Sequence, residues 1–171
     1  MTLVWARVDC KLIHGQISAA WVPHLKAEVI IVADDDTADD PWAQKVMLLG
    51  LPPEIKAAHF TSPRDLAGLL AGRETAGKRV LLIFKNLAGV LEAAAAGLDL
   101  KALNLGNQLD QAVCDRSVRL ADTFFALRDE LAALAQLHQK GLEIIVQSVP
   151  AVRPAKWQPE LYSKPDHAQP Q

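Results

Sequence analysis

One histidine of this chain lies among groups that suit the transfer of a phosphoryl group. Residues 7–16 read Arg-Val-Asp-Cys-Lys-Leu-Ile-His-Gly-Gln, so His14 follows two cations, Arg7 and Lys11, and directly precedes a glycine. An imidazole nitrogen is a nucleophile that can form a covalent intermediate, and nearby cations and helix N-terminal amides stabilise phosphate charge. Asp9 is placed to accept a hydrogen bond from the imidazole and so to fix which nitrogen attacks.

The same residues also fit a structural role. A lone histidine can simply cap a turn, and Lys11 would then be a solvated side chain. A short motif match of this kind also arises by chance. Cys10 lies near Lys11 and His14, which makes a reactive thiolate conceivable, but we favour a bystander role for it. Spacing alone therefore leaves the chemical and the structural interpretation of His14 open.

A second polar segment, residues 104–108, reads Asn-Leu-Gly-Asn-Gln. If a strand ends here, Asn104, Gly106 and Asn107 would bring side-chain amides and positive-φ backbone positions to the end of that strand. An ordinary turn explains the same residues equally well. We therefore treat these three residues as candidates for a second loop of the site.

Acidic residues fill the segment 34–40, which begins Asp34-Asp35-Asp36. Carboxylates are ligands for magnesium, but they are also common at the N-termini of helices. We favour helix capping, and the sequence predicts no metal site. Neither of the glycine-rich loops that hold nucleotide phosphates is present, and the other histidines lack the spacing of metal ligands.

Short apolar runs alternate with segments of helical periodicity along the chain. We expect strands at 3–8, 28–33, 56–60, 79–84, 102–105, within 113–120, and at 142–149. We expect helices at 13–26, from 41 to near 50, and at 63–71, 87–96 and 123–139. The last of these has Asp122 as its expected cap and an apolar stripe that begins at Phe124 and Leu127.

Strands separated by helices predict an α/β fold, a mainly parallel central sheet with helices on both faces. Such sheets bind ligands beyond the carboxyl ends of their strands. We therefore expect function in the loops that follow strands, at 9–15, 34–40, 61–62, 85–86 and 106–111. The histidine loop and the second polar segment are both in this set.

Composition narrows the possible classes of protein. The chain has 171 residues, of which half are hydrophobic, and a net charge of −2, which favours one folded domain and argues against nucleic-acid binding. The two cysteines predict no disulfide framework, and no apolar run is long enough for a membrane helix. We expect a cytoplasmic protein with a domain over 1–150 and a proline-rich C-terminal arm over 151–171.

Residues 7–16, followed by Trp21, resemble the active-site loop of a known family. The family that these residues resemble is the EIIB component of the mannose/fructose/sorbose family of the bacterial phosphoenolpyruvate-dependent sugar phosphotransferase system (PTS). The resemblance covers about 1–150 in one register. It continues through 30–35, Asp39-Asp40-Pro41, Asn104-Leu105-Gly106, 141–144 and Val149-Pro150.

The resemblance implies a mostly parallel sheet of about seven strands and a phosphotransferase activity. His14 would accept a phosphoryl group on Nδ1 from a phosphohistidine of the EIIA protein. It would pass the group to a sugar held by the membrane components EIIC and EIID, with no cofactor of its own. The residues that would bind or orient the phosphate are Arg7, Asp9, Lys11, Gly15 and Gln16.

Three departures from the family pattern keep alternatives open. Lys11 stands where the family commonly has arginine, Cys10 replaces a second aspartate, and Asn107-Gln108 replaces Gly-Met. These changes motivate a regulatory alternative, in which His14 is phosphorylated but no sugar receives the phosphate. A third alternative is a small-ligand binder in which His14 is only a polar contact. Homo-oligomers are compatible with all three.

Overall fold

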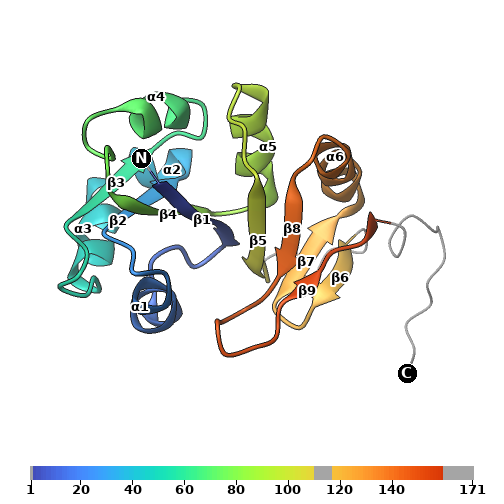
Figure 1. Cartoon of the computed structure of the whole chain (residues 1–171), viewed down its shortest axis with the longest axis horizontal. Coiled ribbons are helices and arrows are strands. Elements are labelled where there is room, and N and C mark those ends of the chain that lie inside the picture. Colours follow the sequence, from blue (N-terminus) through green and yellow to red (C-terminus); the bar gives the residue numbers. More distant parts are fainter. Residues whose placement is uncertain (1, 110–116, 160–171) are drawn as a thin grey trace.

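A seven-stranded sheet forms the centre of the computed structural model, which describes residues 2–109 and 117–159 (Figure 1). The strand order is β3-β2-β4-β1-β5-β8-β9, and every neighbouring pair is parallel except β8 with β9. The strands are β1 (Thr2–Asp9), β2 (Val29–Ala33), β3 (Ala57–Thr61), β4 (Arg79–Phe84), β5 (Ala102–Asn107), β8 (Glu143–Val146) and β9 (Ala155–Lys156). The predicted α/β class with a mostly parallel sheet is confirmed.

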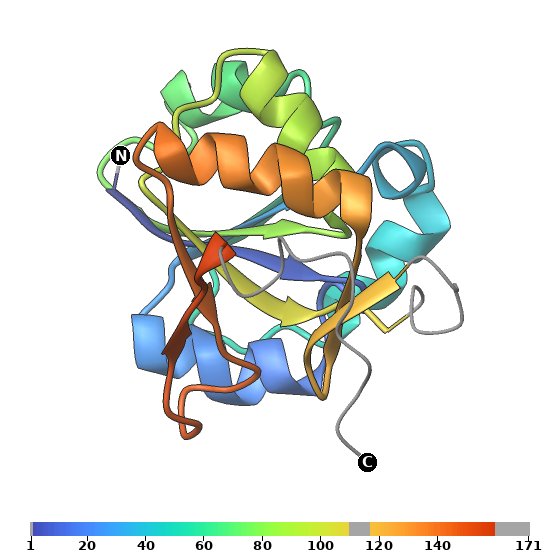
Figure 2. The same ribbon diagram turned by 90° about the vertical axis from the view of Figure 1, so that its right-hand side faces the viewer.

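Helices cover both faces of this sheet. The π-helical turn η1 (Ile17–Trp21) and α1 (Val22–Leu25) lie on one face, with α3 (Pro41–Leu49) beside them. The other face carries α4 (Leu66–Ala71), α5 (Leu87–Ala95) and α6 (Arg128–Gln139). Figure 2 shows α6 and α1 on opposite sides of the sheet. None of the helices in the described part of the chain is long and apolar enough to cross a bilayer.

The alternation of side chains along β1 divides the core from the site. Ala6 and Val8 belong to the apolar cluster under α4, α5 and α6. Because successive strand residues point to opposite faces, Arg7 and Asp9 point toward the face covered by η1 and α1. Both charged side chains are fully buried there.

The predicted helix over 123–139 is wrong at its beginning. Phe124–Leu127 is strand β7, which pairs antiparallel with β6 (Ser117–Ala121), and α6 begins only at Arg128. Phe124 is buried and Phe125 only partly so, an alternation typical of a strand. Asp122 does not cap a helix and pairs instead with Arg119.

Other elements differ mainly at their ends. The helix expected from residue 13 has helical backbone only from residue 15, and the helix expected from residue 63 begins at Leu66. The acidic segment 34–40, expected as a loop, contains the short helix α2 (Asp35–Ala38). Residues 113–116 of the expected strand and 160–171 of the arm lie outside the described residues. Trp157 of the arm is buried.

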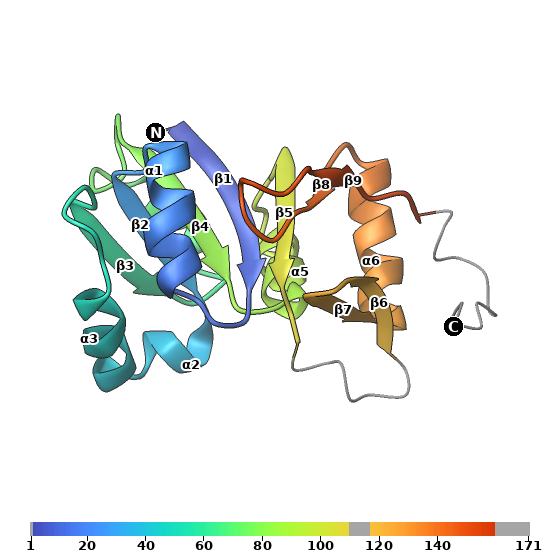
Figure 3. The ribbon, with the colours of Figure 1, turned by 90° about the horizontal axis from the view of Figure 1, so that it is seen from below.

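The strand order places a crevice between β1 and β5. The connection that leaves β1 runs to β2 on one side, whereas the connection that leaves β5 runs toward β8 on the other side. Neighbouring strands whose connections diverge in this way open a crevice at their carboxyl ends. Figure 3 shows the ends of β1 and β5 side by side at that edge, and Cys10 N donates to Asn107 O across it at 2.8 Å.

Candidate functional site

His14 lies in the loop that leaves β1, at the start of the helical backbone that continues into η1. Its carbonyl accepts a hydrogen bond from Ser18 N at 2.9 Å, which makes His14 the residue before the first helical turn. The imidazole side chain is 20% exposed, and its Nε2 lies 3.1 Å from Asp9 Oδ2. The ring is therefore held on one side by protein and open on the other.

Asp9 is the residue that orients the imidazole. Its Oδ2 accepts hydrogen bonds from Arg7 Nε at 3.0 Å and from Arg7 Nη2 at 2.8 Å, and its Oδ1 accepts from Lys11 N at 3.2 Å. An ionised carboxylate only accepts hydrogen bonds, so Nε2 of His14 must be the donor. The neutral ring then carries its proton on Nε2 and a lone pair on Nδ1.

Nδ1 of His14 is the nitrogen left for chemistry. Among residues 2–109 and 117–159, no group hydrogen-bonds to it. A lone pair on a partly exposed nitrogen is available to attack an electrophile that arrives from solvent. The geometry thus separates the two nitrogens into one that anchors the ring and one that can react.

The buried Arg7 side chain holds Asp9 in place. Each of its five N–H groups has an acceptor: Asp9 takes two, Asn104 Oδ1 takes one, and the carbonyls of Gln147 and Ser148 take one each, at 3.0 and 2.9 Å. Burial lowers the pKa of this guanidinium below its ordinary value, and the charge and hydrogen bonds of Asp9 offset only part of that shift. Arg7 is thus in an orienting position, and it has no N–H left for a phosphoryl group.

Trp21 completes the enclosure of Arg7, a role that the sequence did not reveal. Its ring lies under the guanidinium, with 5.0 Å between Cζ and the ring centroid, and its Nε1 donates to Ser148 O at 3.1 Å. In the sequence, Trp21 was only part of the pattern that resembles the family's active-site loop. The carbonyls of Gln147 and Ser148 were missed as well, because backbone acceptors have no sequence signature.

The second polar segment supports the same network. Asn104 accepts from Arg7 and donates through Nδ2 to the carbonyls of Ile145 and Gln147, at 3.3 and 3.1 Å. A Cβ at Gly106 would lie 2.0 Å from Arg7 Cζ, so only glycine leaves room for the guanidinium. The expectation of a positive φ at Gly106 is wrong, since space and not backbone conformation requires this glycine.

Asn107 joins the second segment to the histidine loop. Its Oδ1 accepts a hydrogen bond from Cys10 Sγ at 3.6 Å, in addition to the backbone bond between the same two residues. Leu12, two residues further on, has a φ of 52°, which is strained for a side chain of this kind. The strain is held by a turn in which Leu12 N donates to Asp9 O at 2.9 Å.

The solvent-facing side of the loop around His14 has three exposed residues, Lys11, Gly15 and Gln16. In the part of the chain that the structure describes, no side chain pairs with Lys11 Nζ and no carbonyl accepts from the backbone N–H of Gly15 or Gln16. A Cβ at Gly15 would meet nothing within 4 Å. This side therefore offers free donors and open space beside the imidazole.

The acidic segment has a different role. Asp34 accepts from Thr37 N at 3.0 Å and caps α2, and Asp40 accepts from Trp42 N and Ala43 N at 2.9 and 3.0 Å and caps α3. The predicted capping is confirmed for Asp40, whereas the helix α2 that Asp34 caps was expected as part of a loop. Within residues 2–109 and 117–159, no group of His, Cys, Asp or Glu side chains is arranged to hold a metal ion.

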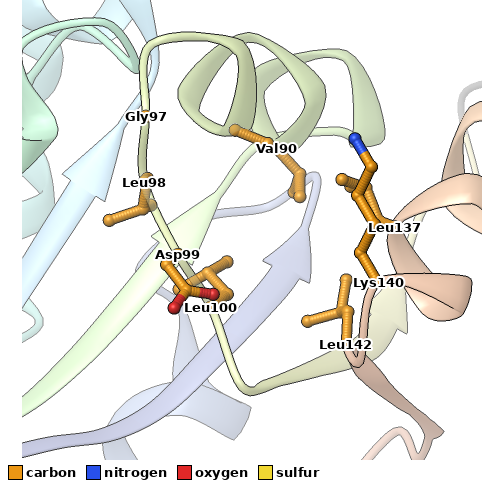
Figure 4. Close-up of a pocket in the computed structure, with 9 residues that line it drawn as sticks. Val90, Gly97, Leu98, Asp99, Leu100, Leu137, Lys140 and Leu142 are labelled. Atoms are coloured by element: carbon orange, nitrogen blue, oxygen red, sulfur yellow. The ribbon is translucent and has the colours of Figure 1, made fainter.

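A cavity of about 200 Å³ lies between the ends of α5 and α6 (Figure 4). Val90, Leu98, Leu137 and Leu142 contribute most of its wall, and Asp99 and Lys140 stand at its border. The connections that form it precede β5 and β8, so it lies at the edge of the sheet opposite His14. Its apolar lining continues the core, and it is separate from the candidate site.

Comparison with known proteins identifies relatives over nearly the whole chain. A family model described as "PTS system sorbose subfamily IIB component" matches residues 3–170. The N-acetylgalactosamine-specific phosphotransferase enzyme IIB component 2 of Escherichia coli is 29% identical over 148 residues, which is 86% of this chain and 91% of that protein. The fructose-specific EIIB component of Bacillus subtilis is 26% identical over 151 residues, 88% of this chain and 90% of the relative.

A fused relative and a solved structure extend this comparison. The mannose-specific EIIAB component of Escherichia coli is 26% identical over 149 residues, which cover 87% of this chain but 45% of that longer protein. The crystal structure of the IIBSor domain of the sorbose permease from Klebsiella pneumoniae has the same fold. Its TM-score is 0.78 at 22% identity, with 91% of this chain and 93% of that chain covered.

Proposed function

We propose that this chain, which belongs to the family of PTS sorbose subfamily IIB components, carries its phosphoryl group on Nδ1 of His14. Membership makes it an EIIB phosphocarrier of a sugar phosphotransferase system of the mannose family. The donor in our proposal is a phosphohistidine of the EIIA protein. The acceptor is a sugar bound by the membrane components EIIC and EIID, beside which the protein works from the cytoplasm.

One observation carries the choice of residue and atom. The contact between His14 Nε2 and Asp9 Oδ2, at 3.1 Å, occupies one ring nitrogen and leaves the other open. Asp9 cannot swing away to bind Nδ1, because Arg7 and the backbone of Lys11 hold both of its oxygens. A single tautomer is thereby prepared before any phosphoryl group arrives.

The transfer step follows from this tautomer. The Nδ1 lone pair of His14 attacks the phosphorus of the donor phosphohistidine, and a new N–P bond forms as the donor's N–P bond breaks and its nitrogen regains the electron pair. The His14 ring keeps its proton on Nε2 and becomes cationic, and Asp9 at 3.1 Å stabilises that charge. In the second step a sugar hydroxyl oxygen attacks the phosphorus, the bond between Nδ1 and phosphorus breaks and Nδ1 regains the electron pair. The hydroxyl proton passes to solvent, and the ring, which still carries its proton on Nε2, is neutral again.

The open side of His14 supplies the contacts for the phosphoryl oxygens. Lys11 and the backbone N–H groups of Gly15 and Gln16 are free donors beside the ring, and a helix N-terminus favours an anion. Such a transfer depends on position and charge. No cofactor or metal of this protein enters the scheme.

Labelling from phosphorylated EIIA tests this assignment. We expect wild type to acquire one acid-labile phosphate per chain and His14→Ala to acquire none. His24→Ala is a matched control, since His24 is an exposed histidine on the helical turn that follows η1. Acid-labile label that still enters His14→Ala would show that another residue is the acceptor.

The regulatory alternative rests on the residues beside the ring. Lys11 keeps the charge of the family arginine but has no planar pair of donors to grip a phosphate. Under that alternative the phosphoprotein forms but never discharges to sugar. Membranes that contain EIIC and EIID, supplied with the phosphoprotein and sugar, separate the two functions, because only a transport component transfers the label to sugar.

A further inference from the structure

Helix α3 exposes an unusual row of large apolar side chains. Trp42, Val46 and Leu49 are 75%, 52% and 87% exposed, and no residue of this helix is buried. Their spacing of four and three residues puts them on one face of the helix. Met47 points the other way and packs against the apolar cluster under η1. The helix is therefore apolar both toward the core and toward solvent.

This outer row, Trp42, Val46 and Leu49, is called the α3 stripe below. Large apolar side chains that gather on a surface mark sites of protein interaction. Tryptophan is the residue type most often found to dominate binding energy at such sites. Core packing does not explain the α3 stripe, because the side that faces the core is occupied by Met47.

The α3 stripe lies beside the candidate phosphoryl site. Ser18, one helical turn after His14, donates through Oγ to the carbonyl of Gly50 at 2.8 Å, directly after the end of α3. Figure 3 shows α3 and the start of the helix that follows β1 at the same edge of the sheet as the arrowhead of β1. Any protein that brings its own histidine to His14 must therefore lie over or next to α3.

We propose that the α3 stripe is the docking surface for the protein that donates the phosphoryl group. This inference rests on the proposed function of His14. The partner would present an apolar patch bordered by basic side chains, because Asp39 and Asp40 are exposed at the N-terminal end of α3. The donor must leave after each transfer, which suits a small interface with one or two strong anchors.

The charges next to the stripe favour this soluble donor over a lipid surface. The cytoplasmic leaflet of a membrane is negatively charged and attracts basic segments. Exposed aspartates beside α3 oppose such binding. A permanent second copy is also disfavoured, because an occupant of this edge has to leave His14 accessible for the next transfer.

Two donors of different size separate docking from chemistry. The variant Trp42→Ser/Leu49→Ser is phosphorylated by phospho-EIIA and, in parallel, by phosphoramidate, a small donor that needs no docking surface. We expect kcat/KM for phospho-EIIA to fall by about 10- to 100-fold, mainly through KM, while labelling by phosphoramidate keeps the wild-type rate. Val152→Ser is the matched control, because Val152 is 48% exposed in the connection between β8 and β9. In the strand order, β8 and β9 lie at the edge of the sheet opposite β3, the strand that follows α3.

Four outcomes would overturn or remove the proposal. An unchanged rate with phospho-EIIA overturns the proposal. An equal loss of rate with both donors also overturns it, because it shows that α3 supports the structure of the site and is not a docking surface. A wild-type dimer that the double variant converts to a monomer, with transfer unchanged, assigns the stripe to a second copy. Wild type that neither donor labels contradicts the proposed function itself, whereas the first three outcomes leave His14 as the acceptor.

Discussion

Two charged segments lie at the same edge of the sheet, one after β1 and the other after β2, yet they have opposite roles. In the histidine loop, Arg7 and Asp9 are fully buried and bind each other, and their network holds one nitrogen of His14 while the other nitrogen stays free. In the acidic segment, the carboxylates of Asp34 and Asp40 accept hydrogen bonds from backbone N–H groups at the N-termini of two helices. The number of charges therefore does not identify a site, whereas a buried charge network that leaves one exposed group does.

Gly106→Ala should cause the largest loss of stability, because it disturbs the buried charge network of the histidine loop. The new methyl group would lie 2.0 Å from Arg7 Cζ, and the guanidinium cannot move without losing its buried acceptors. Overpacking together with a disturbed buried ion pair should lower the free energy of unfolding by about 3–5 kcal/mol. Denaturant unfolding measures the loss.

Gly68→Ala provides the control for that experiment. Gly68 lies in α4, where a Cβ would meet nothing within 4 Å. Alanine in a helix should raise the free energy of unfolding by about 0.5–1 kcal/mol. Equal stabilities of the two variants would contradict the tight enclosure of Arg7 by Gly106.

Asp9→Asn should separate stability from chemistry. The amide has nearly the shape of the carboxylate, but it leaves the buried guanidinium without a counter-charge and can no longer hold one tautomer of His14. We expect a loss of about 3 kcal/mol in stability and a fall of about 10²- to 10⁴-fold in the rate of phosphorylation. Measurement of labelling well below the melting temperature isolates the second effect, and a near wild-type rate there would contradict the role given to Asp9.

Asp34→Ala is the matching change in the acidic segment. Loss of the α2 cap should cost about 1 kcal/mol of stability. Labelling by phosphoramidate should keep the wild-type rate, because Asp34 contacts Thr37 and Lys85 rather than the histidine loop. A clear drop in that chemical labelling would place the acidic segment in the phosphoryl site.

Lys85→Met should have the smallest effect. Lys85 Nζ pairs with Asp36 at 2.9 Å and with Asp34 at 3.4 Å, and the hydrogen bond to Asp36 is the main reason why the pKa of Lys85 is raised. A raised lysine pKa stabilises the fold at pH values below the ordinary lysine pKa, and this contribution disappears as the pH rises through the folded-state value.

We therefore expect Lys85→Met to be less stable than wild type at pH 7 by no more than about 1 kcal/mol. The difference should shrink in high salt and in strongly alkaline solution. Unfolding curves for both proteins over this range of pH and salt measure it. A difference that grows with pH would contradict the ion pairs of Lys85.

Some elements of the fold could be predicted from the sequence and others could not. The parallel sheet, the strand at 79–84 and the cap Asp40 were predictable, because each depends on local apolar patterns or on a side chain that bonds to its own neighbouring backbone. The start of α6 was not. The stripe of Phe124, Leu127 and the leucines after them fits a helix, and only the pairing with β6 makes its first part a strand.

The site was predictable in its residues but not in their arrangement. The loop pattern placed Asp9 beside His14, and the 3.1 Å contact agrees with that placement. Burial of Arg7 and the need for glycine at position 106 depend on three segments far apart in sequence, 7–9, 104–106 and 147–148, which meet only in the folded sheet. No local pattern reports such a contact.

The identity of the nitrogen that carries the phosphate decides whether Asp9 prepares one tautomer of His14 for the transfer. Protein labelled with ¹⁵N in its histidines is phosphorylated by phospho-EIIA, and the ring of His14 is followed by NMR. We predict a phosphorus coupling to Nδ1 and a proton retained on Nε2, next to Asp9. Phosphate on Nε2, or on a histidine other than His14, would contradict it.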